Sequence, residues 1–445
     1  MAGKVINFQS KAVPPGRFDL YMITGRDILY ISSIEWDFLW QAHQEIARRL
    51  AATGNRVLYV ENTGVRSPGI KDAKRVVSRL RRSLHTLGRR GARQVAPNIF
   101  VYSPLVLPPF GSAWQRLLNR RFFLRHLRGI ASGLGMKDVL IWTYLPTDTA
   151  LDIIRCYDND RCLLIYYGVA NFSYLTPKTD QLEKSEQELL RLADLVFVNC
   201  SELAGKFALR QQDAHVFPPG VDMSAFPLET SSDLVGPSDP LNLGKLPRPI
   251  IGNVGGLHRF VDYDLVAAMA SARPDWSWVF LGAPQVPLDK LQGLPNVHLF
   301  GQRPHGELAL HLRFFDVCIV PYLSNGNGEM STVVPTKINE YLAAGKAVVS
   351  TDLPTVRHFN DEHQILVSSP ARPEEFLQSI ERQLGAAHDP VERKRRREVA
   401  SHADWKMLIE QMSGLIEREI ASRSIAPESH RAVAASGGVS APNEW

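Results

Sequence analysis

Residues 335–350 read PTKINEYLAAGKAVVS, and this stretch carries the strongest structural signal in the chain. Pro335 suits the first turn of a short helix, and Gly345 suits the position just after its last turn. The apolar run that follows is typical of a buried strand. Glu340 is the one acidic residue of the stretch, and it lies early in the helix. A carboxylate there either favours the helix dipole or serves a ligand.

Short apolar segments alternate with amphipathic helical segments on both sides of this stretch. This pattern predicts parallel sheets covered by helices on both faces. We therefore expect an α/β protein with two Rossmann-like domains that face a central cleft. The expected parts are an N-terminal extension (1–26), an N-terminal Rossmann-like domain (27–230), a linker rich in Pro, Ser, Gly and Asp (231–248), a C-terminal Rossmann-like domain (249–400), a C-terminal helix that packs back on the N-terminal domain (401–420) and a disordered tail (421–445).

The overall composition narrows the class of protein. The chain has 445 residues, 44% of them hydrophobic and 22% charged, which indicates a globular protein of more than one domain. No apolar run approaches the roughly 18 to 20 residues that a membrane-spanning helix needs, and the N-terminus has no signal-peptide core. The four cysteines form no C-x-x-C pair, so we expect neither a zinc knuckle nor a redox motif. A cytoplasmic location is expected.

Two segments concentrate positive charge in a chain whose net charge is only +5. Segment 71–93 carries nine Lys or Arg residues and one Asp, and segment 114–130 carries five Arg residues among aromatic and leucine side chains. Such segments can dock on an anionic membrane surface, here the inner face of the cell membrane, or can form solvated helix faces. We expect no nucleic-acid partner, because the chain shows no recognition motif and its overall charge is modest.

A glycine-rich turn follows the first expected strand of the C-terminal domain. It reads GNVGGLHR at 252–259 and includes Gly255, Gly256 and Arg259. Glycines in a strand-to-helix turn let backbone N–H groups approach an anion, and Arg259 could complete a diphosphate site. A tight turn without a ligand explains the same residues, and the spacing departs from G-x-G-x-x-G.

Residues 335–351 resemble the nucleotide-sugar signature of the GT-B glycosyltransferases, P-x-K-x-x-E-Y-x-A-x-G-x-P-V-V-x-T. The segment PTKINEYLAAGKAVVST departs from it at Ala347, where proline is usual. The resemblance extends over most of the chain, through RPIIGNVGG before the signature and ADLVFVNCSELAGKF in the N-terminal half. In pattern it is nearest to bacterial polysaccharide-assembly transferases of glycosyltransferase families 1 and 4.

The resemblance implies that Glu340 accepts the two ribose hydroxyls of a nucleotide. The residues themselves suggest further roles: the donor diphosphate would lie against Gly255, Gly256, Arg259 and Lys337. Ser331 and Thr332 would donate hydrogen bonds from the loop SNGNGEMSTVVP, which an ordinary mobile loop explains as well. Thr332 occupies the position eight residues before Glu340 where the family often has a second acid.

The N-terminal half departs further from the family. Tyr167, Ala170 and Asn171 stand where related proteins tend to show a Y-D-x-x-D-D stretch. The catalytic residue is therefore not identified by the resemblance. Three candidates lie after the first expected strand, where a side chain would face the cleft: Glu35, Asp37 and His43. A base is needed if the reaction inverts the anomeric centre, and retention may need none.

The leading interpretation is a glycosyltransferase that moves a sugar from a nucleotide diphosphate sugar to a saccharide or lipid-linked acceptor in bacterial cell-surface or exopolysaccharide synthesis. A nucleotide-sugar 2-epimerase of the same fold and a non-catalytic family member are the alternatives. We expect no cofactor beyond the nucleotide sugar and no metal, because the D-x-D of YDND at 157–160 reads as an ordinary turn. The sugar, the nucleotide, the acceptor, the stereochemistry and the oligomeric state stay open.

Overall fold

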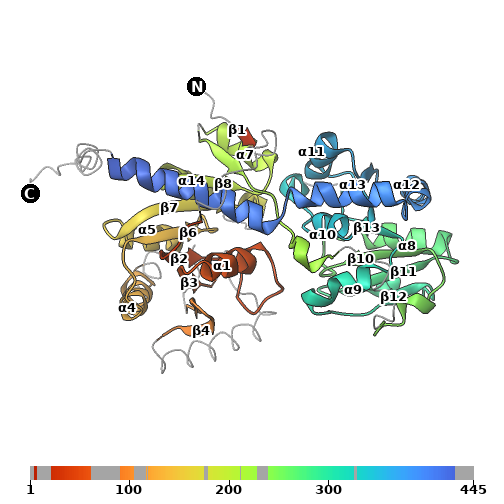
Figure 1. Cartoon of the computed structure of the whole chain (residues 1–445), viewed down its shortest axis with the longest axis horizontal. Coiled ribbons are helices and arrows are strands. Elements are labelled where there is room, and N and C mark those ends of the chain that lie inside the picture. The colour runs from red at the N-terminus through yellow and green to blue at the C-terminus, as the bar shows by residue number, and fades with distance from the viewer. Residues whose placement is uncertain are drawn as a thin grey trace, which may run out of the picture.

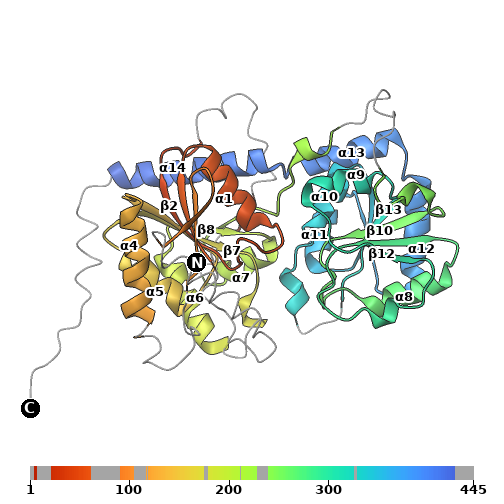
Figure 2. The same ribbon diagram turned by 90° about the horizontal axis from the view of Figure 1, so that it is seen from below.

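Two α/β domains lie side by side, and a long C-terminal helix runs back along the first of them (Figures 1 and 2). A computed structural model describes residues 5–7, 22–61, 91–104, 117, 119–174, 179–210, 212–227, 239–324 and 328–425. Each domain is built on a largely parallel sheet, which confirms the prediction of two Rossmann-like α/β domains. Within the described residues, every helix is too short or too polar to span a bilayer.

The N-terminal sheet has nine strands in the order β1-β9-β8-β7-β6-β2-β3-β5-β4. All its pairs are parallel except β4 with β5. Neither β1, within the expected N-terminal extension, nor β4 was anticipated, because the two segments are only three and four residues long. The strands are β1 (Val5–Asn7), β2 (Asp27–Ile31), β3 (Arg56–Val60), β4 (Arg93–Ala96), β5 (Ile99–Tyr102), β6 (Val139–Thr143), β7 (Arg161–Gly168), β8 (Leu195–Val198) and β9 (Ala214–Val216).

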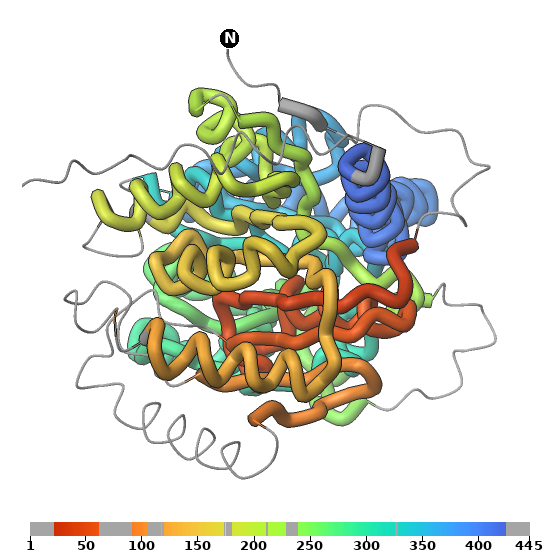
Figure 3. Tube along the Cα trace, turned by 90° about the vertical axis from the view of Figure 1, so that its left-hand side faces the viewer, coloured from red at the N-terminus to blue at the C-terminus, as the bar shows by residue number. Residues whose placement is uncertain are grey.

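Helices cover both faces of this sheet, because its central strands are apolar on both sides. One face packs against α4 to α7, and the other packs against α1 and the C-terminal helix α14. Figure 3 views this domain from its outer end, with α14 in blue and α4 in orange on opposite sides. The helices are α1 (Ala42–Ala52), the π-helix η4 (Asn119–Leu124), α4 (Arg125–Gly133), α5 (Asp148–Cys156), η5 (Phe172–Tyr174), α6 (Thr179–Leu192), α7 (Ser201–Ala208) and η6 (Met223–Ala225).

The C-terminal sheet has six strands, all parallel, in the order β12-β11-β10-β13-β14-β15. They are β10 (Ile250–Val254), β11 (Ser277–Leu281), β12 (Val297–Leu299), β13 (Val317–Val320), β14 (Ala347–Thr351) and β15 (Val367–Ser369). The helical segments are η8 (Leu243–Lys245), α8 (Tyr263–Ala272), η9 (Asp289–Leu291), η10 (His305–Glu307), α9 (Leu308–Leu312), η11 (Glu329–Thr332), α10 (Lys337–Ala343), α11 (Pro354–His363), α12 (Pro373–Gly385) and α13 (Pro390–Ser401). Two core clusters fill the two faces of this sheet.

The chain returns to the N-terminal domain through α14 (Trp405–Ile425). The ring of Trp405 lies so close to Gly220 that a Cβ atom there would come within 2.5 Å of it. Backbone bonds between Val221 and residues 403 and 405 fix this crossing. The helix ends at Ile425 rather than at residue 420, because Ile420 still packs on the core shared with α1.

The structure shows the turn expected at YDND, but it describes the two basic segments only in part. Residues 157–160 form a turn between α5 and β7, as the Asp and Asn residues of YDND indicate. The basic segment 71–93 lies almost wholly outside the described residues, and segment 114–130 is described at residue 117 and from residue 119 onward.

Candidate functional site

Loops from both domains meet beside the strand ends of the C-terminal sheet. Leu39, in the loop after β2, lies 3.5 Å from the position that a Cβ atom would take on Gly256, in the turn after β10. On the other side, the backbone N–H of Asn171 donates to Oγ1 of Thr332 in η11, at 3.3 Å. Because strand carboxyl ends are where α/β domains hold ligands, this boundary is the place to look for a site.

Glycines shape the turn between β10 and α8. Gly255 has a φ of +110°, a conformation that L side chains rarely adopt. A Cβ atom on Gly282 would lie 1.9 Å from the carbonyl oxygen of Gly255, so only glycine permits this approach of β11. The turn is therefore closely packed: Nζ of Lys337 lies 3.3 Å from the position of a Cβ on Gly255, and Nε2 of Gln285 lies 2.4 Å from that of a Cβ on Gly256.

Helix α10 is fixed against this turn by its own side chains. The hydroxyl of Tyr341 accepts a 2.7 Å hydrogen bond from the N–H of Val254, the last residue of β10. The amide of Asn339 donates to the carbonyl of Pro219, in the segment that links the two domains, at 2.8 Å. Gly345 ends the helical segment with a φ of +71°, as its position in the sequence indicates. These contacts place Lys337 against the glycine turn, and Glu340 lies one helical turn further along α10.

Lys337 is an almost fully buried cation. Its Nζ lies 3.5 Å from Oδ1 of Asn253 and 5.1 Å from the centre of the Tyr322 ring. Burial lowers the pKa of Lys337 to about 8, and the nearby carboxylate of Glu340 opposes that shift. Burial of the His258 imidazole, and after it the positive charge of Lys337, lower the pKa of His258 to about 4. The ammonium group therefore lacks full compensation for its lost hydration, which favours binding of an anion.

Glu340 is only partly buried and already has one partner. Its Oε1 lies 2.8 Å from Nε2 of His305, the first residue of η10. That hydrogen bond raises the pKa of His305 above its usual value. Among the described residues, Oε2 of Glu340 accepts no hydrogen bond. The carboxylate can therefore take further donors.

The other predicted donor-binding residues have partners of different kinds. Arg259 is half-exposed, forms an ion pair with Glu329 of η11, and stacks over the ring of Phe260 at 4.5 Å. Ser331 donates back to the carbonyl of Gly328 in its own loop. Thr332 faces the N-terminal domain through its bond from residue 171. Lys337, Glu340 and the glycine turn thus lie together, whereas Ser331 and Thr332 serve the loop and the domain boundary.

The three catalytic candidates do not converge on one point. Asp37 is exposed and forms a 2.8 Å ion pair with Arg93 of β4. His43 is buried, burial lowers its pKa to about 3, and its Nε2 lies 2.8 Å from Oγ of Ser33. Glu35 is half-buried in the loop after β2. His43 is therefore a neutral imidazole at physiological pH.

Sequence reasoning missed the residues that hold this loop in shape. The Gln44 side chain donates to the carbonyls of Trp36 and Leu39 at 3.3 Å, and accepts from the N–H of Gln41 at 3.0 Å. Glu61, at the end of β3, accepts from the N–H of Trp36 at 2.9 Å. A glutamine three residues after the helix cap was the available signal. His305, by contrast, had no signal, because its link to Glu340 spans 35 residues.

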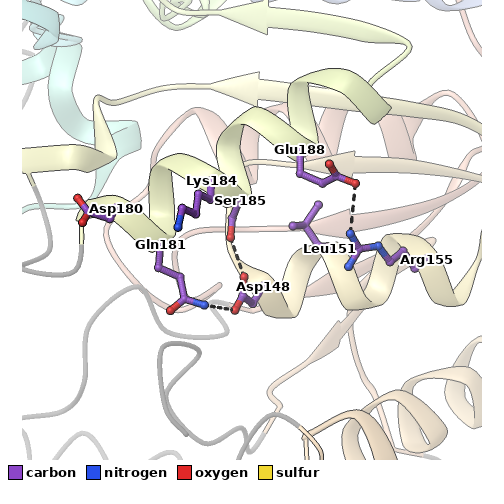
Figure 4. A pocket seen from close by; sticks show the side chains of 8 residues that line it. All are labelled: Asp148, Leu151, Arg155, Asp180, Gln181, Lys184, Ser185 and Glu188. Carbon is purple, nitrogen blue, oxygen red and sulfur yellow. Dashed lines mark hydrogen bonds and ion pairs between the residues drawn. The ribbon is translucent and has the colours of Figure 1, made fainter. Parts of the chain in front are cut away.

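A separate groove of about 560 Å³ runs between α5 and α6 of the N-terminal domain (Figure 4). Asp148 accepts hydrogen bonds there from Gln181 at 2.8 Å and from Ser185 at 2.6 Å. Arg155 pairs with Glu188 at 3.2 Å. These groups satisfy one another, so the groove is a weaker candidate than the boundary between the domains.

No group of three or more His, Cys, Asp and Glu side chains within the described part of the chain could hold a metal ion. The expectation that the protein needs no metal and no cofactor stays a prediction.

Comparisons with known proteins agree with the sequence resemblance. Residues 248–385 match the family model described as glycosyl transferases group 1. TuaH of Bacillus subtilis (strain 168), named as a glycosyltransferase of teichuronic acid biosynthesis, is 26% identical over 241 residues. That alignment covers 52% of this chain and 58% of TuaH, so the chain aligns with little more than half of that relative's length.

Solved structures show the same fold at low identity. Sucrose-phosphate synthase from Thermosynechococcus elongatus superposes with a TM-score of 0.62 at 16% identity, over 89% of this chain and 100% of that one. HepE from Anabaena, solved with UDP and glucose, gives 0.56 at 15% identity, over 88% and 99%. WaaG, a glycosyltransferase of lipopolysaccharide biosynthesis, gives 0.53 at 14% identity, over 87% and 99%. The resemblance is thereby confirmed: residues 248–385 carry a domain of the glycosyl transferases group 1 family, within a chain that has the GT-B fold.

Proposed function

We propose that this protein is a glycosyltransferase that moves a sugar from a nucleotide diphosphate sugar to an acceptor bound by the N-terminal domain. One observation carries the proposal. On the C-terminal domain the buried cation of Lys337 lies against the glycine turn at Gly255, and the accessible carboxylate of Glu340 lies one helical turn further along α10. These are the groups that a diphosphate and a ribose require.

The donor is assigned to these groups by charge. The ammonium of Lys337 and the N–H of Gly256 would take the diphosphate, with Arg259 at its exposed end. The N–H of Gly255 already donates to the carbonyl of Leu281 at 2.8 Å. A departing diphosphate carries more charge than the bound donor, so fixed cations stabilise the transition state for its release. Glu340 would take the ribose hydroxyls. HepE was solved with UDP, so UDP is the first nucleotide to test.

The acceptor is assigned to the loop after β2, because that loop touches the donor turn. Phe38 and Trp40 are 46% and 38% exposed there, and exposed aromatic faces suit the apolar faces of sugar rings. None of the three catalytic candidates is assigned as the base. His43 is buried with a pKa lowered to about 3, so its imidazole accepts a proton poorly at physiological pH, and Asp37 is tied to an arginine.

A lipid-linked acceptor at the inner surface of the cell membrane is the finer part of the proposal. It is supported by the exposed side of η4 and α4, where Phe122 is 66% exposed among Arg120, Arg121 and Arg125. Cationic segments with exposed aromatic side chains bind anionic lipid surfaces without spanning them. WaaG and TuaH are named for surface-polysaccharide pathways, which fits such an acceptor.

The first experiment tests donor binding and transfer. The protein is heated with UDP, ADP, GDP and their common hexose conjugates, and a nucleotide that binds the folded state should raise the unfolding temperature. The matching radiolabelled nucleotide sugar is then incubated with bacterial membrane lipids. Transfer of label to the lipid fraction is the expected result. Conversion of the donor alone would indicate an epimerase, and binding without either reaction would indicate a non-catalytic protein.

Replacing Glu340 tests its role as the ribose acceptor. Glu340→Ala should weaken nucleotide binding by roughly ten- to a hundredfold, because hydrogen bonds to a charged group contribute about 1.5 to 3 kcal/mol. Glu340→Gln should cost less. Affinity is measured by calorimetry, with the exposed Glu362→Ala as control and circular dichroism as the test of folding. Unchanged affinity in a folded Glu340→Ala protein would remove this residue from the site.

The pH dependence of binding tests Lys337. Its lowered pKa of about 8 means that the ammonium is charged below that pH and loses its proton as the pH rises through it. The ratio of nucleoside diphosphate affinity to nucleoside affinity should therefore fall between about pH 7 and pH 9.5, because only the diphosphate contacts the ammonium. Lys337→Met should weaken diphosphate binding at neutral pH and make this ratio independent of pH. The exposed Lys290→Met is the control and should keep the decline of wild type. A decline of the ratio that persists in Lys337→Met would assign the titration to another group.

Vesicle binding tests the membrane surface. Replacing Arg121 and Arg125 with Gln and Phe122 with Ser should reduce sedimentation with anionic vesicles by about tenfold or more, because each cation contributes about 1 kcal/mol. Wild-type binding should weaken as salt rises. Arg191→Gln with Leu209→Ser, two exposed positions elsewhere on the domain, is the control. Equal sedimentation of both variants would show that η4 and α4 present only a solvated face.

A further inference from the structure

His305 and Glu340 form a contact that the sequence did not suggest. His305 begins η10, just after β12, and Glu340 lies on α10, on another part of the C-terminal domain. The Nε2–Oε1 distance is 2.8 Å. The two side chains are 50% and 21% exposed, so the contact lies where a ligand can reach it.

The geometry of this contact leaves the carboxylate able to bind a diol. A carboxylate has about four lone-pair sites on its two oxygens, and His305 uses one of them. The second lone pair of Oε1 and both lone pairs of Oε2 remain for a ligand. Two neighbouring ribose hydroxyls can each donate to one oxygen of the carboxylate, which requires the carboxylate to keep a fixed orientation. A glutamate side chain that is free to rotate must first be ordered, and its bond to a second element supplies that order in advance.

Carboxylates from three elements face the imidazole of His305. They are Glu340 on α10, Glu45 on α1 and Asp222 just before η6, and together they favour the protonated ring. The last two also pair with arginine: Arg48 and Arg49 contact Glu45, and Arg49 contacts Asp222. His305 therefore lies between the C-terminal domain and acidic groups that are held by the N-terminal domain and the crossing segment.

We propose that His305 is a positioning residue that holds the carboxylate of Glu340 in the orientation that receives the two ribose hydroxyls of a nucleotide. The inference rests on the proposed donor site. It assigns His305 no contact with the nucleotide itself. Its effect is transmitted through Glu340, so the effect disappears when the ligand has no ribose hydroxyls.

The experiment compares ribonucleotides with 2′,3′-dideoxynucleotides. UDP, ADP and GDP and their dideoxy forms are titrated into wild type, His305→Ala and His305→Gln. His305→Ala should weaken binding of the ribonucleotide by about tenfold and leave the dideoxy form unchanged. His305→Gln keeps an N–H donor and should recover part of the loss. His388→Ala is the matched control, because it removes a similar 2.9 Å histidine–carboxylate contact, to Asp316, elsewhere in the same domain.

The affinity for a ribonucleotide divided by the affinity for its 2′,3′-dideoxy form also isolates the titration of His305. The diphosphate is common to both ligands, so any contribution of Lys337 cancels in the ratio. In wild type the ratio should fall as the pH rises through the raised pKa of His305, because the protonated ring orders the carboxylate more strongly. In His305→Gln the ratio should not depend on pH.

Each outcome decides between the proposals. Equal losses for both ligands in His305→Ala and His305→Gln would overturn the positioning role and indicate a structural one, as would an unchanged ratio in both folded variants. If wild type binds none of the six nucleotides, or binds both forms of each equally, the ribose site itself is wrong. Thermal unfolding of every variant establishes folding, and His305→Gln carries the test if His305→Ala does not fold.

Discussion

The buried ammonium group of Lys337 is the constraint on which the C-terminal domain depends. A charge taken out of water destabilises the fold unless nearby groups replace the lost hydration. Here Asn253 and the face of Tyr322 do so in part. The ammonium also needs space, which the missing side chain at Gly255 supplies, and a Cβ on Gly282 would collide with the same turn. The glycines and the lysine are thus one arrangement, and an anion would complete the compensation, which we propose is the diphosphate of a ligand.

The boundary between the domains ties this arrangement to the N-terminal half. The bond from Asn171 holds Thr332, the last residue of η11, and the helix α14 leaves the C-terminal domain to complete the core beneath α1. A threonine where relatives often have an acid therefore has a structural explanation in this chain. It accepts a backbone hydrogen bond from the other domain, which a carboxylate could do only at the cost of burying a charge. The position of η11 therefore depends on how the two domains pack against each other.

Local pattern predicted most of the fold, and contacts distant in sequence account for what it missed. The alternation of apolar strands and helices was enough to predict two parallel sheets, and the signature around Glu340 was enough to place it beside Lys337. The strands β1 and β4 are only three and four residues long, so their pairing depends on neighbours that no local window contains. His305 was missed for the same reason. The catalytic residue stays unassigned, because Glu35 and Asp37 lie in the loop after β2 whereas His43 is buried in α1.

The two charged ends of the proposed donor site must respond to a ligand in opposite ways. At one end, Arg259 is paired with the carboxylate of Glu329. A diphosphate is also an anion, so it would compete with Glu329 for Arg259, and the Glu329 side chain would have to release the guanidinium. At the other end, His305 and a ribose hydroxyl are both donors to Glu340, and a carboxylate accepts several hydrogen bonds at once. Ribose can therefore bind by sharing, with His305 in place. The contact between Arg259 and Glu329 at the phosphate end would therefore have to rearrange when a nucleotide binds. The contact between His305 and Glu340 at the ribose end would stay in place.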